Sequence, residues 1–94
     1  MPLNPVAIQF GNNLRYCRRR ADFSQEEVGF RASLHRTEIG LLERGERVPR
    51  IDTLVKVATA LEVAPEELLA DITFKPGSVQ PGGFTLSPPP EESP

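Results

Sequence analysis

The apolar residues between about Val6 and Asp71 recur at helical spacing. Those of the first segment lie one turn apart, at Phe10, Leu14, Cys17 and Ala21. Those of a later segment share one face in the same way, at Ile51, Leu54, Val57, Ala58 and Leu61. The pattern predicts helices throughout this stretch. It also assigns Cys17 to the core, with redox sensing by its thiol as the alternative.

Capping and turn residues indicate where the first helices begin and end. Asp22 breaks the first helix. Ser24 and Glu27 then form an S-x-x-E capping box, in which each side chain bonds to the other's backbone N–H at the start of the second helix. Residues 33–34 interrupt the second helix, which is therefore short.

The same signals predict three more helices. A third helix runs over about 35–44 and stops at Gly45, a residue type that adopts the left-handed conformation after a helix. A fourth covers about 51–61, and Pro65 opens a short fifth helix. The predicted fold is all-α, a compact five-helix bundle.

The composition changes sharply near residue 71. The 23 residues from 72 to 94 include six prolines and three glycines, which disfavour helices. Two short β-prone runs, at 72–74 and 84–86, either pair as a hairpin or dock on the bundle. Residues 87–94 are expected to form an extended, disordered tail. The chain is thus divided into a helical domain over 1–71 and a Pro/Gly-rich tail over 72–94.

Length and composition exclude several classes of protein. A chain of 94 residues forms one small domain, and its single cysteine allows no internal disulfide and no zinc-type ligand set. It has no recognisable signal peptide and no apolar run long enough to span a membrane, so a cytoplasmic protein is predicted. No nucleophile–base set, phosphate loop or metal-ligand cluster is apparent, and we expect neither enzymatic activity nor a cofactor or metal.

The charge is distributed unevenly along the chain. Residues 1–50 carry nine arginines against six acidic residues, a net charge of +3. Residues 51–94 carry two lysines against seven acidic residues, a net charge of −5. The basic half suggests a polyanionic partner, and guanidinium groups match phosphates and guanine edges well.

Two short helices separated by about three residues are typical of a helix-turn-helix, here over about 24–45. The apolar set that points inward is Val28, Ala32, Leu34, Ile39 and Leu42. The opposite face of the helix at 35–44 then carries Arg36, Thr37, Gly40, Leu41 and Arg44. A face that is only solvated usually carries Lys, Glu and Gln. The residues found here therefore favour a surface that reads bases.

These residues resemble the lambda-repressor-like, Cro-type helix-turn-helix family, the XRE family. The matching positions are 24–28, Ile39, 42–45, Pro49, 51–61 and 65–69, so the resemblance covers about 10–69. It implies that Gln25 and Arg44 contact phosphate and that Arg36, Thr37 and Leu41 contact bases. It also implies a partly buried pair of Arg18 and Glu43, which ties the first helix to the third.

Several residues depart from the family pattern. Gly29 and Ser33 occupy positions usually filled by Ala and Gly, so Ser33 has to adopt the turn conformation without the freedom of glycine. His35 and Arg50 replace the usual Ser or Thr caps, and we expect weaker caps there. His35 is interpreted as an imperfect cap or a phosphate contact, and Gly40 either admits DNA closely or reflects neutral drift.

The sequence therefore predicts a sequence-specific, DNA-binding transcriptional regulator that binds a pseudo-palindromic operator as a homodimer. The residues predicted to contact double-stranded DNA are Gln25, His35, Arg36, Thr37, Gly40, Leu41, Arg44, Arg47 and Arg50. The alternative is a protein-interaction module or antitoxin on the same fold. The candidate dimer surface consists of apolar residues near the fifth helix: Leu61, Val63, Leu68, Leu69 and 72–74.

Overall fold

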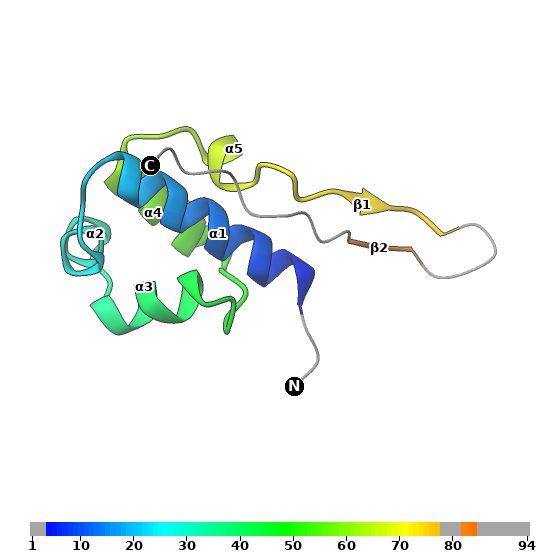
Figure 1. The fold of residues 1–94 in the computed structure, drawn as a ribbon, viewed down its shortest axis with the longest axis horizontal. Helices are drawn as coiled ribbons and strands as arrows, with labels where there is room; N and C mark the ends of the chain where they lie inside the picture. The colour runs from blue at the N-terminus through cyan, green and yellow to red at the C-terminus, as the bar shows by residue number, and fades with distance from the viewer. Residues whose placement is uncertain (1–3, 78–81, 85–94) are drawn as a thin grey trace.

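The computed structural model describes residues 4–77 and 82–84. Within them the chain forms five helices and two very short strands (Figure 1). The elements are α1 (Pro5–Arg20), α2 (Gln25–Ala32), α3 (Arg36–Glu43), α4 (Ile51–Leu61), α5 (Pro65–Leu68), β1 (Phe74–Lys75) and β2 (Gly83–Phe84). The predicted five-helix bundle is confirmed, and no helix in the described ranges is both long and apolar enough to cross a membrane.

Capping side chains and turns mark the starts and ends of the helices much as the sequence indicates. The Ser24 hydroxyl accepts a hydrogen bond from the Glu27 N–H at 3.0 Å, which caps α2. Ser33 ends α2 with φ 58°, in the left-handed region that favours glycine. The same conformation occurs at Glu62 after α4, at φ 56°, and at two aspartates, Asp22 and Asp71.

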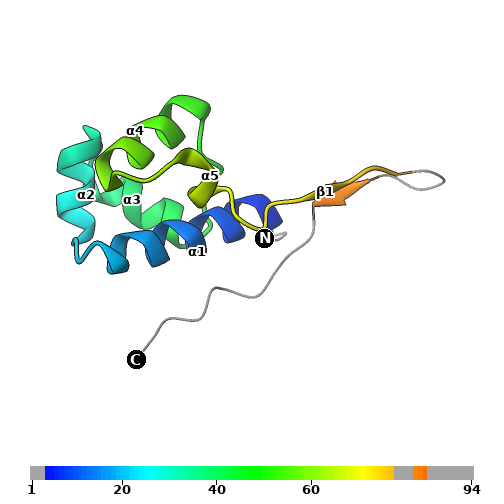
Figure 2. The ribbon, with the colours of Figure 1, turned by 90° about the horizontal axis from the view of Figure 1, so that it is seen from above.

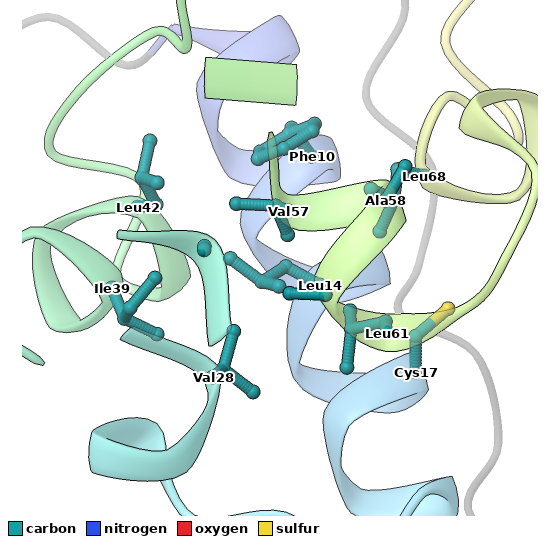
Figure 3. Packing of buried hydrophobic residues seen from close by; sticks show 12 residues of the cluster. Phe10, Leu14, Cys17, Val28, Ile39, Leu42, Val57, Ala58, Leu61 and Leu68 are labelled. Carbon is teal, nitrogen blue, oxygen red and sulfur yellow. The ribbon is translucent and has the colours of Figure 1, made fainter. Parts of the chain in front are cut away.

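The core lies where α1 meets the other helices (Figure 3). Its largest fully buried apolar side chains are Phe10, Leu14, Ile39, Leu42, Leu68, Val28 and Val57. Leu61 and Leu68 are 5% and 0% exposed, so they belong to this core and the prediction that they form a dimer surface is wrong. The physical reason is that a bundle this small needs the apolar residues at the end of α4 and in the short α5 to close the core. Cys17 is buried as well.

A glycine allows α1 and α3 to approach closely. A Cβ atom at Gly11 would lie 2.4 Å from the Leu42 carbonyl oxygen and 2.7 Å from that of Glu43. Both neighbours are backbone atoms, so neither can rotate away. The absence of a side chain at Gly11 therefore sets the distance between α1 and the end of α3.

A buried amide anchors the turn after α5 to α1. The Asn13 amide donates to the carbonyl oxygens of Leu68 and Ala70, at 3.0 and 2.8 Å, and its own oxygen accepts from the Gln9 amide. These bonds satisfy polar groups that burial would otherwise leave without water. They hold α5 against the middle of α1.

The two strands form the hairpin, one of the two arrangements that the sequence allows. β1 and β2 pair antiparallel, with Phe74 opposite Phe84 and Lys75 opposite Gly83. The two phenylalanine rings meet edge to face with centroids 5.3 Å apart, and the hairpin extends away from the helices in both views (Figures 1 and 2). The predicted run at 85–86 and the tail at 87–94 lie outside the described residues.

We predict that Gly11→Ala lowers the free energy of unfolding by about 2 kcal/mol, because the new methyl group meets backbone atoms on both sides. Gly40→Ala is the matched control, since its Cβ would meet only the flexible ends of two side chains, Arg44 at 3.0 Å and Gln25 at 3.6 Å. There the higher helix propensity of alanine leaves stability unchanged or raises it by up to about 1 kcal/mol. Urea unfolding measures both, and equal effects would contradict the close approach of α1 and α3.

Candidate nucleic-acid interface

The helix α3 divides into a buried face and a solvent face. Ile39 and Leu42 are fully buried against the core. Arg36 and Thr37 are exposed and Leu41 is half-buried on the other side. Figure 1 shows α3 along the lower edge of the bundle, after the tight turn from α2. The structure thus brings the three residues assigned to base reading onto one side of α3.

Gly40 does not lie open on that side, and the expectation that it does is wrong. It is buried, and a Cβ atom there would lie 3.0 Å from the Arg44 guanidinium and 3.6 Å from the Gln25 amide oxygen. Two long side chains cover the glycine. Helical spacing gives the direction of a residue but not what its neighbours cover.

His35 caps α3 with its ring. The His35 Nδ1 accepts a hydrogen bond from the Thr37 N–H at 3.1 Å, and it lies 2.9 Å from the Thr37 hydroxyl. The imidazole thus takes the place of the Ser or Thr side chain expected at this position. Although we expected a weak cap here, its hydrogen bond is formed. Arg50 at the start of α4 makes no such cap hydrogen bond, as expected.

Arg36 is the cation nearest the start of α3. Its guanidinium lies 3.6 Å from the Glu26 carboxylate on α2, and the two side chains are 67% and 78% exposed. Exposed pairs of this kind contribute about 0–1 kcal/mol. The Arg36 side chain can therefore leave Glu26 for a better partner at little cost.

Three further arginines follow along the segment from α3 into α4. Arg44 pairs with Glu46, and Arg50 lies 3.4 Å from Asp52. Arg47 pairs with Glu38 of α3. Each guanidinium that the sequence assigns to phosphate or groove contacts thus has an acidic neighbour on the same surface, which neutralises it locally.

Behind the exposed side of α3, a buried carboxylate joins three helices. Glu43 is 4% exposed and accepts from Arg18 through both oxygens, at 2.5 and 3.0 Å. It also accepts from the Gln25 amide of α2 at 3.1 Å. The pair implied by the resemblance is present. Gln25, which the resemblance assigns to phosphate, uses one of its donors inward.

Arg15 completes this arrangement, and the sequence analysis missed it. Its guanidinium donates to the Glu43 backbone carbonyl at 2.9 Å, one of the carbonyls at the end of α3 that the helix itself leaves unpaired. A positive charge there also complements the helix dipole. The sequence signal for this role was the position of Arg15, one turn before Arg18 on α1.

Comparisons with known proteins identify the family of the chain. The helix-turn-helix family HTH_3 matches residues 14–68, which is more than half of the chain. This chain belongs to the helix-turn-helix family. A curated family member, the control protein C.BamHI of Bacillus amyloliquefaciens, is 39% identical over 67 residues, which span 70% of this chain and 83% of that protein.

Two solved structures of helix-turn-helix proteins are similar. The restriction-modification controller protein C.AhdI from Aeromonas hydrophila has a TM-score of 0.65 and 39% identity, over 66% of this chain and 94% of that one. The DNA-binding domain of the P22 c2 repressor has a TM-score of 0.62 and 27% identity, over 64% and 79% of the two chains. The bundle is therefore the repressor-type helix-turn-helix fold.

We predict that Arg18→Ala destabilises this helix-turn-helix domain by about 3–5 kcal/mol, because the buried Glu43 carboxylate is left without its cation. Arg50→Ala is the control: its pair with Asp52 is exposed on both sides, so the loss is within about 1 kcal/mol. Thermal unfolding followed by circular dichroism compares them. A melting temperature for Arg18→Ala close to that of Arg50→Ala is the contradicting result.

Proposed function

We propose that the chain is a sequence-specific, DNA-binding transcriptional regulator that inserts α3 into the major groove. The observation that carries this proposal is the division of α3. Arg36, Thr37 and Leu41 face outward, while the core and the buried Glu43 hold the helix from behind. A recognition helix needs both properties, because base contacts require side chains held in a fixed register against the groove.

The exposed residues of α3 suit particular base edges. The Arg36 guanidinium can donate two hydrogen bonds to guanine O6 and N7, which is the commonest specific contact in major grooves. The Thr37 and Leu41 side chains carry methyl groups that can contact the methyl group of thymine. Together they read a short half-site.

The surrounding arginines suit the phosphate backbone. Arg44, Arg47 and Arg50 lie along the segment that leads from α3 to α4, and each faces an acidic neighbour. On DNA, a phosphate replaces the carboxylate as the partner of each guanidinium. Contacts of this kind position the protein and weaken as salt rises, whichever sequence is bound.

Similarity to two named proteins supports a more specific role for this small regulator. C.AhdI, at 39% identity, is a restriction-modification controller, and C.BamHI, also at 39%, is a control protein. We therefore propose a controller rather than an antitoxin or a prophage repressor. No observation favours the alternative of a module whose main partner is another protein.

One helix reads too few base pairs to find a promoter, so we propose that the regulator acts as a homodimer. Ile51 and Val55 are 82% and 51% exposed and lie four residues apart on α4, which makes them neighbours on one face. This apolar face follows directly after the arginine-bearing segment 44–50. To match one DNA turn, a symmetric contact there has to place both copies of α3 on one side of the dimer, about 34 Å apart.

Selection of bound sequences from a random DNA pool tests the proposed function. We expect a motif of two inverted half-sites with centres about one helical turn apart. Recovery of a single, unrepeated half-site would exclude the dimer. Failure to enrich any sequence, at a salt concentration that removes non-specific binding, would exclude sequence-specific recognition.

We predict that Arg36→Ala weakens binding to the selected operator by about 1–3 kcal/mol and relaxes the preference at one base pair. Arg36→Lys keeps the charge but loses the two-pronged contact, so it should retain phosphate attraction without the guanine preference. Arg50→Ala is expected to weaken operator and random DNA alike. If Arg36→Ala also weakens both equally in fluorescence anisotropy titrations, Arg36 is a phosphate contact.

Substitutions that introduce a charge test the proposed dimer surface. We predict that Ile51→Glu makes the protein monomeric in sedimentation velocity at concentrations where the wild type is a dimer, because two carboxylates would then be buried in a symmetric contact. Phe74→Glu serves as the control: Phe74 is 56% exposed and lies in the region near α5 that the sequence suggested. A dimer that survives Ile51→Glu but not Phe74→Glu would move the interface to the hairpin.

A further inference from the structure

The hydrogen bonds at the start of α3 define which ring nitrogen of His35 carries the proton. The Thr37 backbone N–H, 3.1 Å from His35 Nδ1, can only donate, so Nδ1 is an acceptor and the proton of the neutral ring is on Nε2. The Thr37 hydroxyl lies 2.9 Å from the same Nδ1. Since Nδ1 has no hydrogen to give, the hydroxyl is the donor in this contact and shares the one Nδ1 lone pair with the Thr37 N–H.

This bond decides what Thr37 offers to a base. Its only hydroxyl hydrogen is used by His35, so toward the groove the side chain offers a methyl group and oxygen lone pairs. Thymine presents a methyl group there, and adenine and cytosine present amino hydrogens. Guanine presents only the acceptors N7 and O6, which Thr37 in this state cannot serve.

We propose that His35 is a specificity-determining residue that acts through Thr37: the neutral imidazole makes Thr37 reject guanine, and the protonated imidazole lets it accept guanine. This inference rests on the proposed function, in which Thr37 faces the bases. When Nδ1 gains a proton it becomes a donor, so the Thr37 oxygen accepts from it and the hydroxyl hydrogen is released toward the groove. No bond is made or broken beyond this proton transfer.

The surroundings of His35 permit the change. The ring is exposed and borders a shallow hollow shared with Glu26, Phe30, Leu34 and Arg36. The charged groups that face it are Glu26 from α2 and Arg36 from α3, and these lie 3.6 Å from each other. Protonation also removes the acceptor for the Thr37 N–H and puts a positive charge at the start of a helix, so it weakens the cap.

His35 is the only histidine of the chain, and His35→Asp removes its imidazole from the comparison. Carboxylic acids ordinarily titrate near pH 4, below the range used here. Those groups therefore stay ionised, and burial raises the pKa of the Cys17 thiol above its ordinary value, so the thiol stays protonated. A change of base preference between about pH 8 and about pH 5.5 that His35→Asp abolishes is therefore assigned to the imidazole.

The experiment is selection from a random DNA pool at both pH values with the wild type, His35→Asp and Thr37→Val. Aspartate caps helices well and accepts hydrogen bonds at both pH values, and valine keeps the shape of threonine without the hydroxyl. For the wild type we expect guanine to gain about fivefold over thymine at one position of each half-site at the lower pH, the ratio of about one neutral hydrogen bond. Neither variant should change its preference there.

The outcomes separate the two proposals. A motif that the wild type selects identically at both pH values, or a shift that His35→Asp shares, overturns the role of His35 and leaves the proposed function standing. The absence of any motif overturns both. Nitrogen NMR of the free protein at about pH 8 gives an answer without DNA: Nε2 is expected to carry the proton, and a proton on Nδ1 overturns the inference. Thermal melts of both variants establish that they are folded.

Discussion

The position of α3 depends on one buried negative charge. The Glu43 carboxylate at its last turn is bound by Arg18 from α1 and by Gln25 from α2, and Arg15 binds the backbone carbonyl of the same residue. A carboxylate that is 4% exposed is tolerable only because a guanidinium meets both of its oxygens. The three helices are therefore tied together at a point just behind the exposed side of α3, the surface proposed to face DNA.

This arrangement separates rigidity from recognition. The residues that hold α3 lie on its inner side and at its last turn, while the residues proposed to select bases lie on its outer side. Arg36 and Thr37 can thus differ between regulators without a change in how the helix is held. The exposed arginines are loosely paired with nearby carboxylates, which offsets their charge locally and leaves the guanidinium groups available.

Much of the fold and part of the site followed from the sequence. Periodic apolar residues and caps located all five helices, and the resemblance implied the Arg18–Glu43 pair. Two features did not follow. Gly40 is covered by the long side chains of Arg44 and Gln25, and Leu61 and Leu68 complete the core. Each depends on the reach or packing of side chains in three dimensions, which helical periodicity does not contain.

The residues that end α2 and α4, Ser33 and Glu62, affect how much destabilisation such a regulator can tolerate as it evolves. Both residues adopt the left-handed conformation without being glycine, at φ 58° and 56°, which costs each about 1 kcal/mol. The domain is therefore less stable than its fold permits. Glycine at either position would restore that margin, and the margin could then offset a destabilising change on the outer side of α3 that alters which operator is read.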